Sequence, residues 1–104
     1  MKIQINTDKN VAGSEELKIS LTAFISDELS RYNDKISRLE IHLSDEDGAK
    51  NGQNDKRCML EARLEGMQPI AVSAHSNSDH EAVVDAVNKL KASLKSKLGK
   101  LKNY

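Results

Sequence analysis

The last quarter of the chain carries a long helical repeat, and this repeat limits the fold more than any other feature. From Asp79 onward, apolar side chains recur at intervals of three and four residues, which is the spacing of a helix with one buried face. They are Val83, Ala86, Val87, Leu90, Leu94, Leu98 and Leu101. Asp79 is a candidate N-cap, and Glu81 falls in the first turn, where the helix dipole favours an acid. We therefore predict a helix over residues 79 to about 102.

A helix of this length constrains what it can pack against. At about 1.5 Å per residue it would span roughly 35 Å. Strands of about six to eight residues cover only about 20–26 Å. We therefore expect the last turns of the helix to extend beyond any sheet on which it packs.

A second helical repeat covers residues 15 to about 32. Ser14 is a candidate N-cap, and Glu15 and Glu16 fall in the first turn. The apolar positions are Leu17, Leu21, Phe24, Ile25, Leu29, Tyr32 and Ile36. This single stripe predicts a helix that packs one face on a core.

Four other segments alternate apolar and polar residues, which is the period of a strand with one buried face. They are residues 2–6, 38–44, 57–66 and 70–76. The side chains expected on the buried face are Ile3, Ile5, Leu39, Ile41, Leu43, Cys58, Leu60, Ala62, Leu64, Ile70, Val72 and Ala74. Residues 45–56 contain two glycines, two asparagines, four acids and no large apolar residue, so they predict a solvated connection.

The element order is therefore β-α-β-β-β-α, and the predicted fold class is α+β. Helices with one apolar stripe and strands with one apolar face predict a two-layer sandwich, in which a four-stranded sheet carries both helices on one face. The crossover through the first helix should make the first two strands parallel and leave antiparallel hairpins after them, so the sheet is mixed. This order extends that of double-stranded RNA-binding modules by one strand. A length of 104 residues fits a single domain over residues 1–104.

Charge is segregated along the chain. Residues 1–85 hold all 16 acids and 10 bases, whereas residues 86–104 hold six lysines and no acid, although the formal net charge is zero. A solubilising helix face normally mixes both signs, so this run favours contact with a polyanion such as RNA. The alternative is that the lysines only solubilise the helix and complement the negative end of its dipole.

The residue patterns of enzymes and metal sites are missing from the sequence. There is no Cys-x-x-Cys, no His-x-x-x-His and no glycine-rich phosphate loop. His42 and His75 should share the polar sheet face, but on strands separated by another strand, about 9–10 Å apart. The acidic stretch 45–55 lacks the closing Glu of a calcium loop. We predict no enzymatic activity, no metal, no cofactor and no small-molecule substrate.

The cysteine count and the hydropathy pattern indicate the compartment. Cys58 is the single cysteine, which excludes an intrachain disulfide and fits a reducing compartment, and we expect it to be buried and unreactive. No apolar run approaches the roughly 18 residues of a membrane span or forms a signal peptide. We therefore predict a cytoplasmic protein without membrane contact.

Five stretches of the chain carry a family resemblance. They are "KIQIN", "DELSRY", "IHLS", "AVSAHSNSD" and "DHEAVVDAVNKLKASLKSKLGK". In order and spacing they resemble the ribosome hibernation-promoting factor and ribosome-associated inhibitor family, in a short form like the sigma-54 modulation proteins. The resemblance implies the fold predicted above. It also implies a factor of stress and stationary phase that binds the ribosomal RNA of the small subunit, where messenger and transfer RNA sit, and so silences idle ribosomes.

Basic residues of both helices contact the ribosomal RNA in that family. Arg31 and Lys89 match such positions, and Lys91, Lys95 and Lys97 lie about one position away from them. The RNA-binding set predicted for this chain is Arg31, Lys35, Lys89, Lys91, Lys95, Lys97 and Lys100. Four other residues stand where the family often has a basic residue: Thr22, Glu28, Ala92 and Ser96. Glu81 stands where an aromatic residue is usual.

The resemblance leaves alternatives open. A short form lacks the C-terminal dimerisation domain of the long forms, so we expect a monomer off the ribosome. Such a protein could promote ribosome pairing or only block initiation. A diverged paralogue whose basic helix docks an acidic protein, such as a transcription regulator, is the alternative function.

Overall fold

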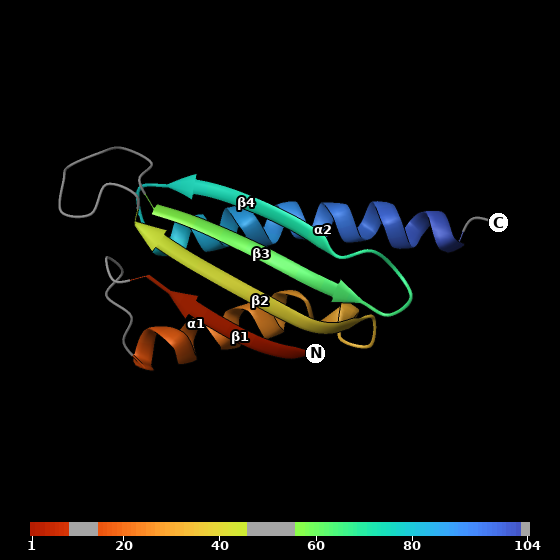
Figure 1. The fold of residues 1–104 in the computed structure, drawn as a ribbon, viewed down its shortest axis with the longest axis horizontal. Coiled ribbons are helices and arrows are strands. Elements are labelled where there is room, and N and C mark those ends of the chain that lie inside the picture. The colour runs from red at the N-terminus through yellow and green to blue at the C-terminus, as the bar shows by residue number, and fades with distance from the viewer. Residues whose placement is uncertain (9–14, 46–55, 103–104) are drawn as a thin grey trace.

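The computed structural model describes residues 1–8, 15–45 and 56–102, and their elements follow the predicted β-α-β-β-β-α order (Figure 1). The strands are β1 (Lys2–Thr7), β2 (Ile36–Asp45), β3 (Lys56–Leu64) and β4 (Ile70–Ser76). The helical elements are α1 (Glu15–Glu28), the short 3-10 helix η1 (Ser30–Tyr32) and α2 (Asp79–Lys102).

The four strands form one mixed sheet in the order β1-β2-β3-β4. β1 runs parallel to β2 because α1 crosses between them, and the β2–β3 and β3–β4 pairs are antiparallel. Ile41 of β2 lies opposite Leu60 of β3, which lies opposite Val72 of β4. Since side chains alternate along a strand, this register gathers the apolar residues on one face, as predicted.

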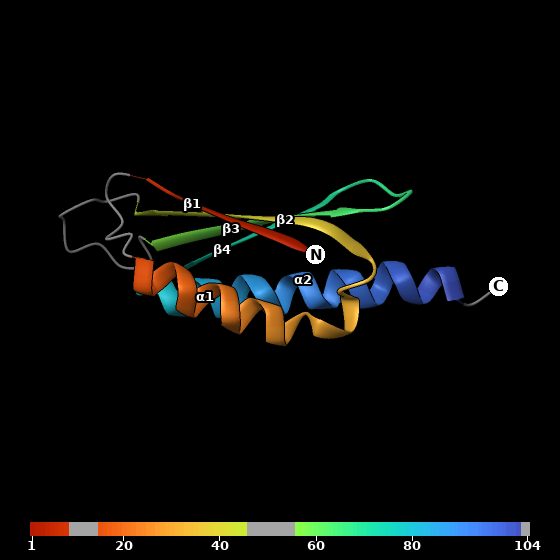
Figure 2. The ribbon, with the colours of Figure 1, turned by 90° about the horizontal axis from the view of Figure 1, so that it is seen from below.

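Both helices cover that apolar face, and the other face of the sheet is left open (Figure 2). They run side by side in the same direction, with α2 over β3 and β4 and α1 on the β1 side (Figure 1). The last turns of α2 extend beyond the β3–β4 turn (Figure 1). The predicted two-layer α+β architecture is therefore confirmed.

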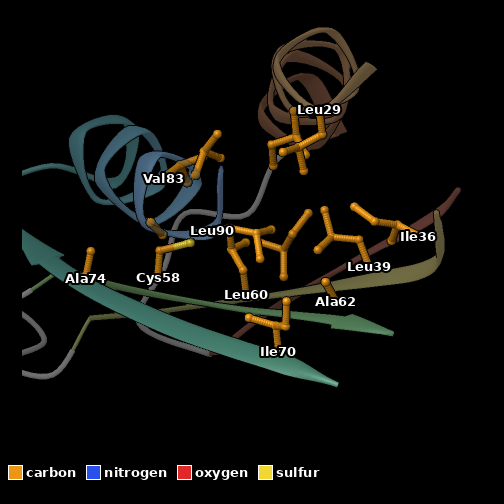
Figure 3. Close-up of a cluster of buried hydrophobic side chains, with 14 of the residues drawn as sticks. Leu29, Ile36, Leu39, Cys58, Leu60, Ala62, Ile70, Ala74, Val83 and Leu90 are labelled. Atoms are coloured by element: carbon orange, nitrogen blue, oxygen red, sulfur yellow. The ribbon is translucent and has the colours of Figure 1, made fainter. Parts of the chain in front are cut away.

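The core lies between the sheet and the two helices (Figure 3). Ile25 of α1 and Leu90 of α2 are both 0% exposed. Most side chains of the core are almost completely buried: Leu21, Leu29, Ile36, Leu39, Ile41, Leu43, Cys58, Leu60, Ala62, Leu64, Ile70, Ala74, Ala82, Val83, Ala86, Val87 and Leu94. These include most of the positions that the two helical stripes and the four alternating segments predicted.

Cys58 lies inside this core, as the sequence predicted. Burial raises the pKa of its thiol to about 12, and the nearby charge of Asp79 acts in the same direction. A thiol with so high a pKa stays protonated at neutral pH, and the thiolate is the reactive form. Cys58 is therefore a structural residue of the folded protein.

The first helix ends earlier than its apolar repeat predicted. α1 stops at Glu28, and Tyr32 N–H donates to Leu29 O at 2.9 Å, a tighter bond over three residues that forms η1. Ile36, which fits the helical spacing, instead begins β2 opposite Leu64. The sequence was ambiguous there because Ile36 also precedes the strand alternation, and the β-branched side chain suits a strand.

The cap of α2 also differs from the prediction by one residue. Ser78, not Asp79, is the N-cap, because Ser78 Oγ accepts a hydrogen bond from Glu81 N–H at 3.1 Å and Ser78 O accepts one from Ala82 N–H at 3.0 Å. Asp79 stands in the first turn, where its charge complements the dipole. The predicted cap at Ser14 and most of the predicted connection 45–56 lie outside the described residues.

Replacing Ser78 with Ala should lower the free energy of unfolding by about 0.5–2 kcal/mol, because the Glu81 N–H loses its acceptor. Urea denaturation measures this loss. Ser96→Ala is the control, since Ser96 is an exposed residue inside the same helix and alanine favours a helix interior. Equal losses in both variants would contradict the assignment of Ser78 as the cap.

Candidate nucleic-acid interface

Most of the predicted RNA-binding residues belong to elements that reach one end of the molecule, although Lys89 contacts Ser73 in the middle of β4. α1 and α2 begin at the same end, so η1 and the turn after it reach the end toward which the later turns of α2 run (Figure 1). We call the basic end the set Arg31, Lys35, Lys89, Lys91, Lys95, Lys97 and Lys100. Asp34 and Glu65 lie on turns at the same end. The side chain of Lys100 is outside the described part of the chain.

The opposite end of the helical layer is acidic. Glu15 and Glu16 stand in the first turn of α1, and Asp79 and Glu81 stand in the first turn of α2. Acids are stabilised at helix N-termini by the positive end of the dipole. Because the two helices run in the same direction, the acids of both first turns lie at one end of the molecule, opposite the basic end.

Lys89 and Lys91 lie on different flanks of α2. Two residues turn the helix by about 200°, so their side chains leave it on nearly opposite sides. Lys89 Nζ donates to the backbone Ser73 O of β4 at 2.8 Å. Lys91 Nζ instead lies 3.1 Å from Glu28 Oε1, at the end of α1. The six lysines of the last helix therefore do not form one continuous face.

Lys97 is an exposed residue near the C-terminal end of α2. It follows Leu90 by seven residues, or about two turns, so it shares the helix face of the buried Leu90 and Leu94. At Leu90 and Leu94 this face is core, whereas at Lys97 it meets solvent. Lys95, one turn after Lys91, is exposed as well. The C-terminal half of α2 therefore presents lysines on more than one flank.

The connection after α1 adds two exposed cations. The guanidinium of Arg31 lies 5.5 Å from the centroid of the Tyr32 ring, a cation–π contact that leaves Arg31 exposed. Lys35 is exposed at the end of the turn, where its backbone N–H donates to Tyr32 O at 2.9 Å. Both side chains are thus available to an anion.

Three helix positions where the family is often basic are uncharged in this protein. Thr22 is half-buried, and Ala92 and Ser96 are exposed. On α1 a shallow hollow is lined by Lys18, Ile19, Thr22 and Ala23, and Ile19 is 67% exposed. A phosphate backbone on this face would meet Lys18 but few other cations.

The open face of the sheet is polar and shows no metal site among the described residues. His42 and His75 lie on β2 and β4 with β3 between them, as predicted. Arg38 pairs with Glu40 at 3.6 Å, while Glu61 and Arg63 form a similar pair at 3.2 Å. Two basic side chains of this face are therefore paired with acids on their own strands.

The sequence predicted neither a calcium loop nor a membrane span. Of the acidic stretch weighed as a calcium loop, Asp45 is described, and it forms an ion pair with Lys56 at 2.5 Å. Residues 46–55 lie outside the described part of the chain. In the described residues, no helix has the length and apolar character needed to cross a membrane.

Glu28 is the residue that sequence reasoning missed. The motif comparison marked it only as an acid at an often basic position. Its partner Lys91 is 63 residues away in the sequence, and no local spacing signals a contact over that distance. The position of α1 along α2 determines whether Glu28 and Lys91 meet, and that position depends on how the core packs.

Solved structures of other proteins share this architecture. The Thermus thermophilus Protein Y N-terminal domain matches with a TM-score of 0.71 and 20% identity, over 92% of this chain and 98% of that one. A ribosomal subunit interface protein from Coxiella burnetii matches with a TM-score of 0.71 and 24% identity, over 95% and 99%. The chain thus has the two-layer α+β fold of these proteins.

The family follows from the sequence match. Residues 4–102 match the family described as Sigma 54 modulation protein / S30EA ribosomal protein, so the chain belongs to this ribosome-associated family. None of the curated proteins matches the chain significantly. The family membership that the five stretches indicated is therefore confirmed.

Proposed function

We propose that this protein is a ribosome-associated translation inhibitor that binds ribosomal RNA of the small subunit through its basic end. Residues 1–104 act as a single ribosome-binding domain and occupy the site of messenger and transfer RNA. The protein works by occupancy, without a reaction, cofactor or small-molecule substrate. Binding to ribosomes implies that it acts in the cytoplasm, and it is a monomer before it binds.

One observation carries this proposal within the family. Exposed cations come from two separate parts of the chain, the connection after α1 and the later turns of α2, and both parts reach the same end of the molecule. Arg31, Lys95 and Lys97 belong to this set. A duplex or folded RNA presents many phosphates along its surface, so cations from two elements can contact it together. Lysine and arginine contacts to phosphates supply most of the affinity of such complexes.

The proteins of similar structure support the same partner. One is called a ribosomal subunit interface protein, and a position at a subunit interface fits a factor that competes with messenger and transfer RNA. The alternative is a protein-docking module, for example one that modulates a transcription regulator. The exposed Ile19 on α1 favours this alternative, because apolar side chains suit a protein partner better than RNA.

Cosedimentation with separated ribosomal subunits tests the proposal. The protein should sediment with small subunits, and the bound fraction should fall steeply between about 50 and 200 mM salt, because salt opposes phosphate contacts. Binding to neither subunit, or binding that salt does not weaken, would favour the protein-docking alternative. Ribosome profiles across growth phases then distinguish pairing of ribosomes from a block of initiation.

A further inference from the structure

We propose that Glu28 restrains Lys91 and thereby lowers the affinity of the basic end for RNA. The inference rests on the proposed function and concerns the regulation of the same site. Glu28 is the last residue of α1, and its Oε1 lies 3.1 Å from Nζ of Lys91 in α2. Glu28 is thus an internal competitor for the phosphate that Lys91 would bind.

The exposure of the pair makes this competition possible. The side chains of Lys91 and Glu28 are 38% and 32% exposed, so RNA can approach Lys91 without any movement of the core. An ion pair at such a surface is weak, and a phosphate can displace the carboxylate. When that happens, Glu28 keeps its negative charge beside the RNA, so the exchange neutralises no net phosphate charge.

Neighbouring lysines of α2 differ from Lys91 in this respect. Lys89 donates to the neutral carbonyl Ser73 O, which leaves its charge available to an anion. Lys95 lies one turn after Lys91 on the same flank and is exposed. Lys91 therefore differs from both of these available cations, because its own charge is balanced by a carboxylate of α1.

α1 supplies a matched control for Glu28. Asp27 is the preceding residue and is exposed, and it leaves the helix about 100° away from Glu28. Glu28→Gln and Asp27→Asn each replace a carboxylate with its amide and raise the net charge by one. A general effect of charge on RNA affinity is the same in both variants, whereas the release of Lys91 occurs only in Glu28→Gln.

The test is binding of the full chain to small ribosomal subunits across a salt series. Glu28→Gln should bind about two- to five-fold more tightly than Asp27→Asn, which is the strength expected of a surface ion pair. The plot of log affinity against log salt should also steepen by up to about 0.9 in Glu28→Gln, because one more phosphate is neutralised. Equal affinities and slopes for the two variants would overturn the inference.

The same comparison in a Lys91→Gln background completes the test. There, Glu28→Gln should gain no more than Asp27→Asn, because the restrained cation is gone. If the excess gain persisted, Glu28 would act directly on RNA and not through Lys91, which would overturn the inference. If the parent and every variant failed to bind small subunits, the proposed function would fall and this inference with it. Binding by the parent with equal variants refutes only the inference.

Thermal unfolding distinguishes restraint from a purely structural role. A pair that mainly ties α1 to α2 would make Glu28→Gln less stable than Asp27→Asn and leave its affinity no higher, which would contradict the proposal. Restraint of Lys91 predicts the reverse: midpoints that agree within a few degrees, together with the gain in affinity.

Discussion

Replacing Leu90 with Ala should lower the free energy of unfolding by about 2–5 kcal/mol, and Ile25→Ala should cost a similar amount. Both side chains are 0% exposed and come from the two helices that cover the sheet, and Figure 3 shows Leu90 in the core. Each substitution removes buried apolar surface and leaves a cavity, since a packed core relaxes only in part. For a single domain of this size, such a loss is a large share of the total stability.

The control for this prediction lies on α1 itself. Ile19 is 67% exposed, so Ile19→Ala should change the free energy of unfolding by no more than about 0.5 kcal/mol. Chemical denaturation followed by circular dichroism measures all three variants. If Ile19→Ala were as costly as Ile25→Ala, the side of α1 assigned to the core would be wrong.

Replacing Arg31, Lys95 and Lys97 together with Gln should weaken binding to small subunits by about one to two orders of magnitude near physiological salt. The three side chains are exposed and lie at the basic end. The slope of log affinity against log salt should become shallower by up to about 2.7 units, since each of the three lost contacts contributes at most about 0.9. The fold should survive, because none of the three belongs to the core.

A second triple variant controls for the change in total charge. Lys2, Arg38 and Arg63 lie in one row across β1, β2 and β3, on the sheet face away from the helices. Changing these three to Gln removes the same charge, but should leave both the affinity and the salt slope closer to those of the parent. Equal losses in the two variants would indicate a general charge effect in place of a directed contact.

Much of the fold could be predicted from side-chain periodicity. Alternation at two residues and repeats at three to four residues each select one backbone conformation, and the buried set of the sheet matches the predicted one closely. Ile36 shows where periodicity is insufficient, since it fits both the helical repeat before it and the strand that it begins. Ser78 and Asp79 show a similar limit at a helix start, where both residues can cap.

The candidate site could be predicted only in outline. Segregated charge pointed to the last helix, and family motifs pointed to Arg31. The partners of Lys89 and Lys91 depend on how α2 packs on β4 and α1, which no local pattern encodes. The exposure of Lys97 likewise requires knowing where the sheet ends under α2. Such relations between distant parts of the chain arise only once the core has formed.

The contact between the basic end and small-subunit RNA can be measured directly by RNA cleavage from a tethered probe. Cys58 is buried and its thiol pKa is raised to about 12, so a thiol-reactive iron chelate will attach selectively to a cysteine introduced at the surface. Ser96→Cys places the chelate between Lys95 and Lys97, and Ala71→Cys places it on the exposed far face of the sheet.

Hydroxyl radicals from Ser96→Cys should cut the RNA of the small subunit strongly at a few sites, while those from Ala71→Cys should cut these sites more weakly. Added messenger and transfer RNA should suppress the cleavage, because they compete for the same place. No cleavage from position 96, or equal cleavage from both positions, would contradict the claim that this protein binds the ribosome through its basic end.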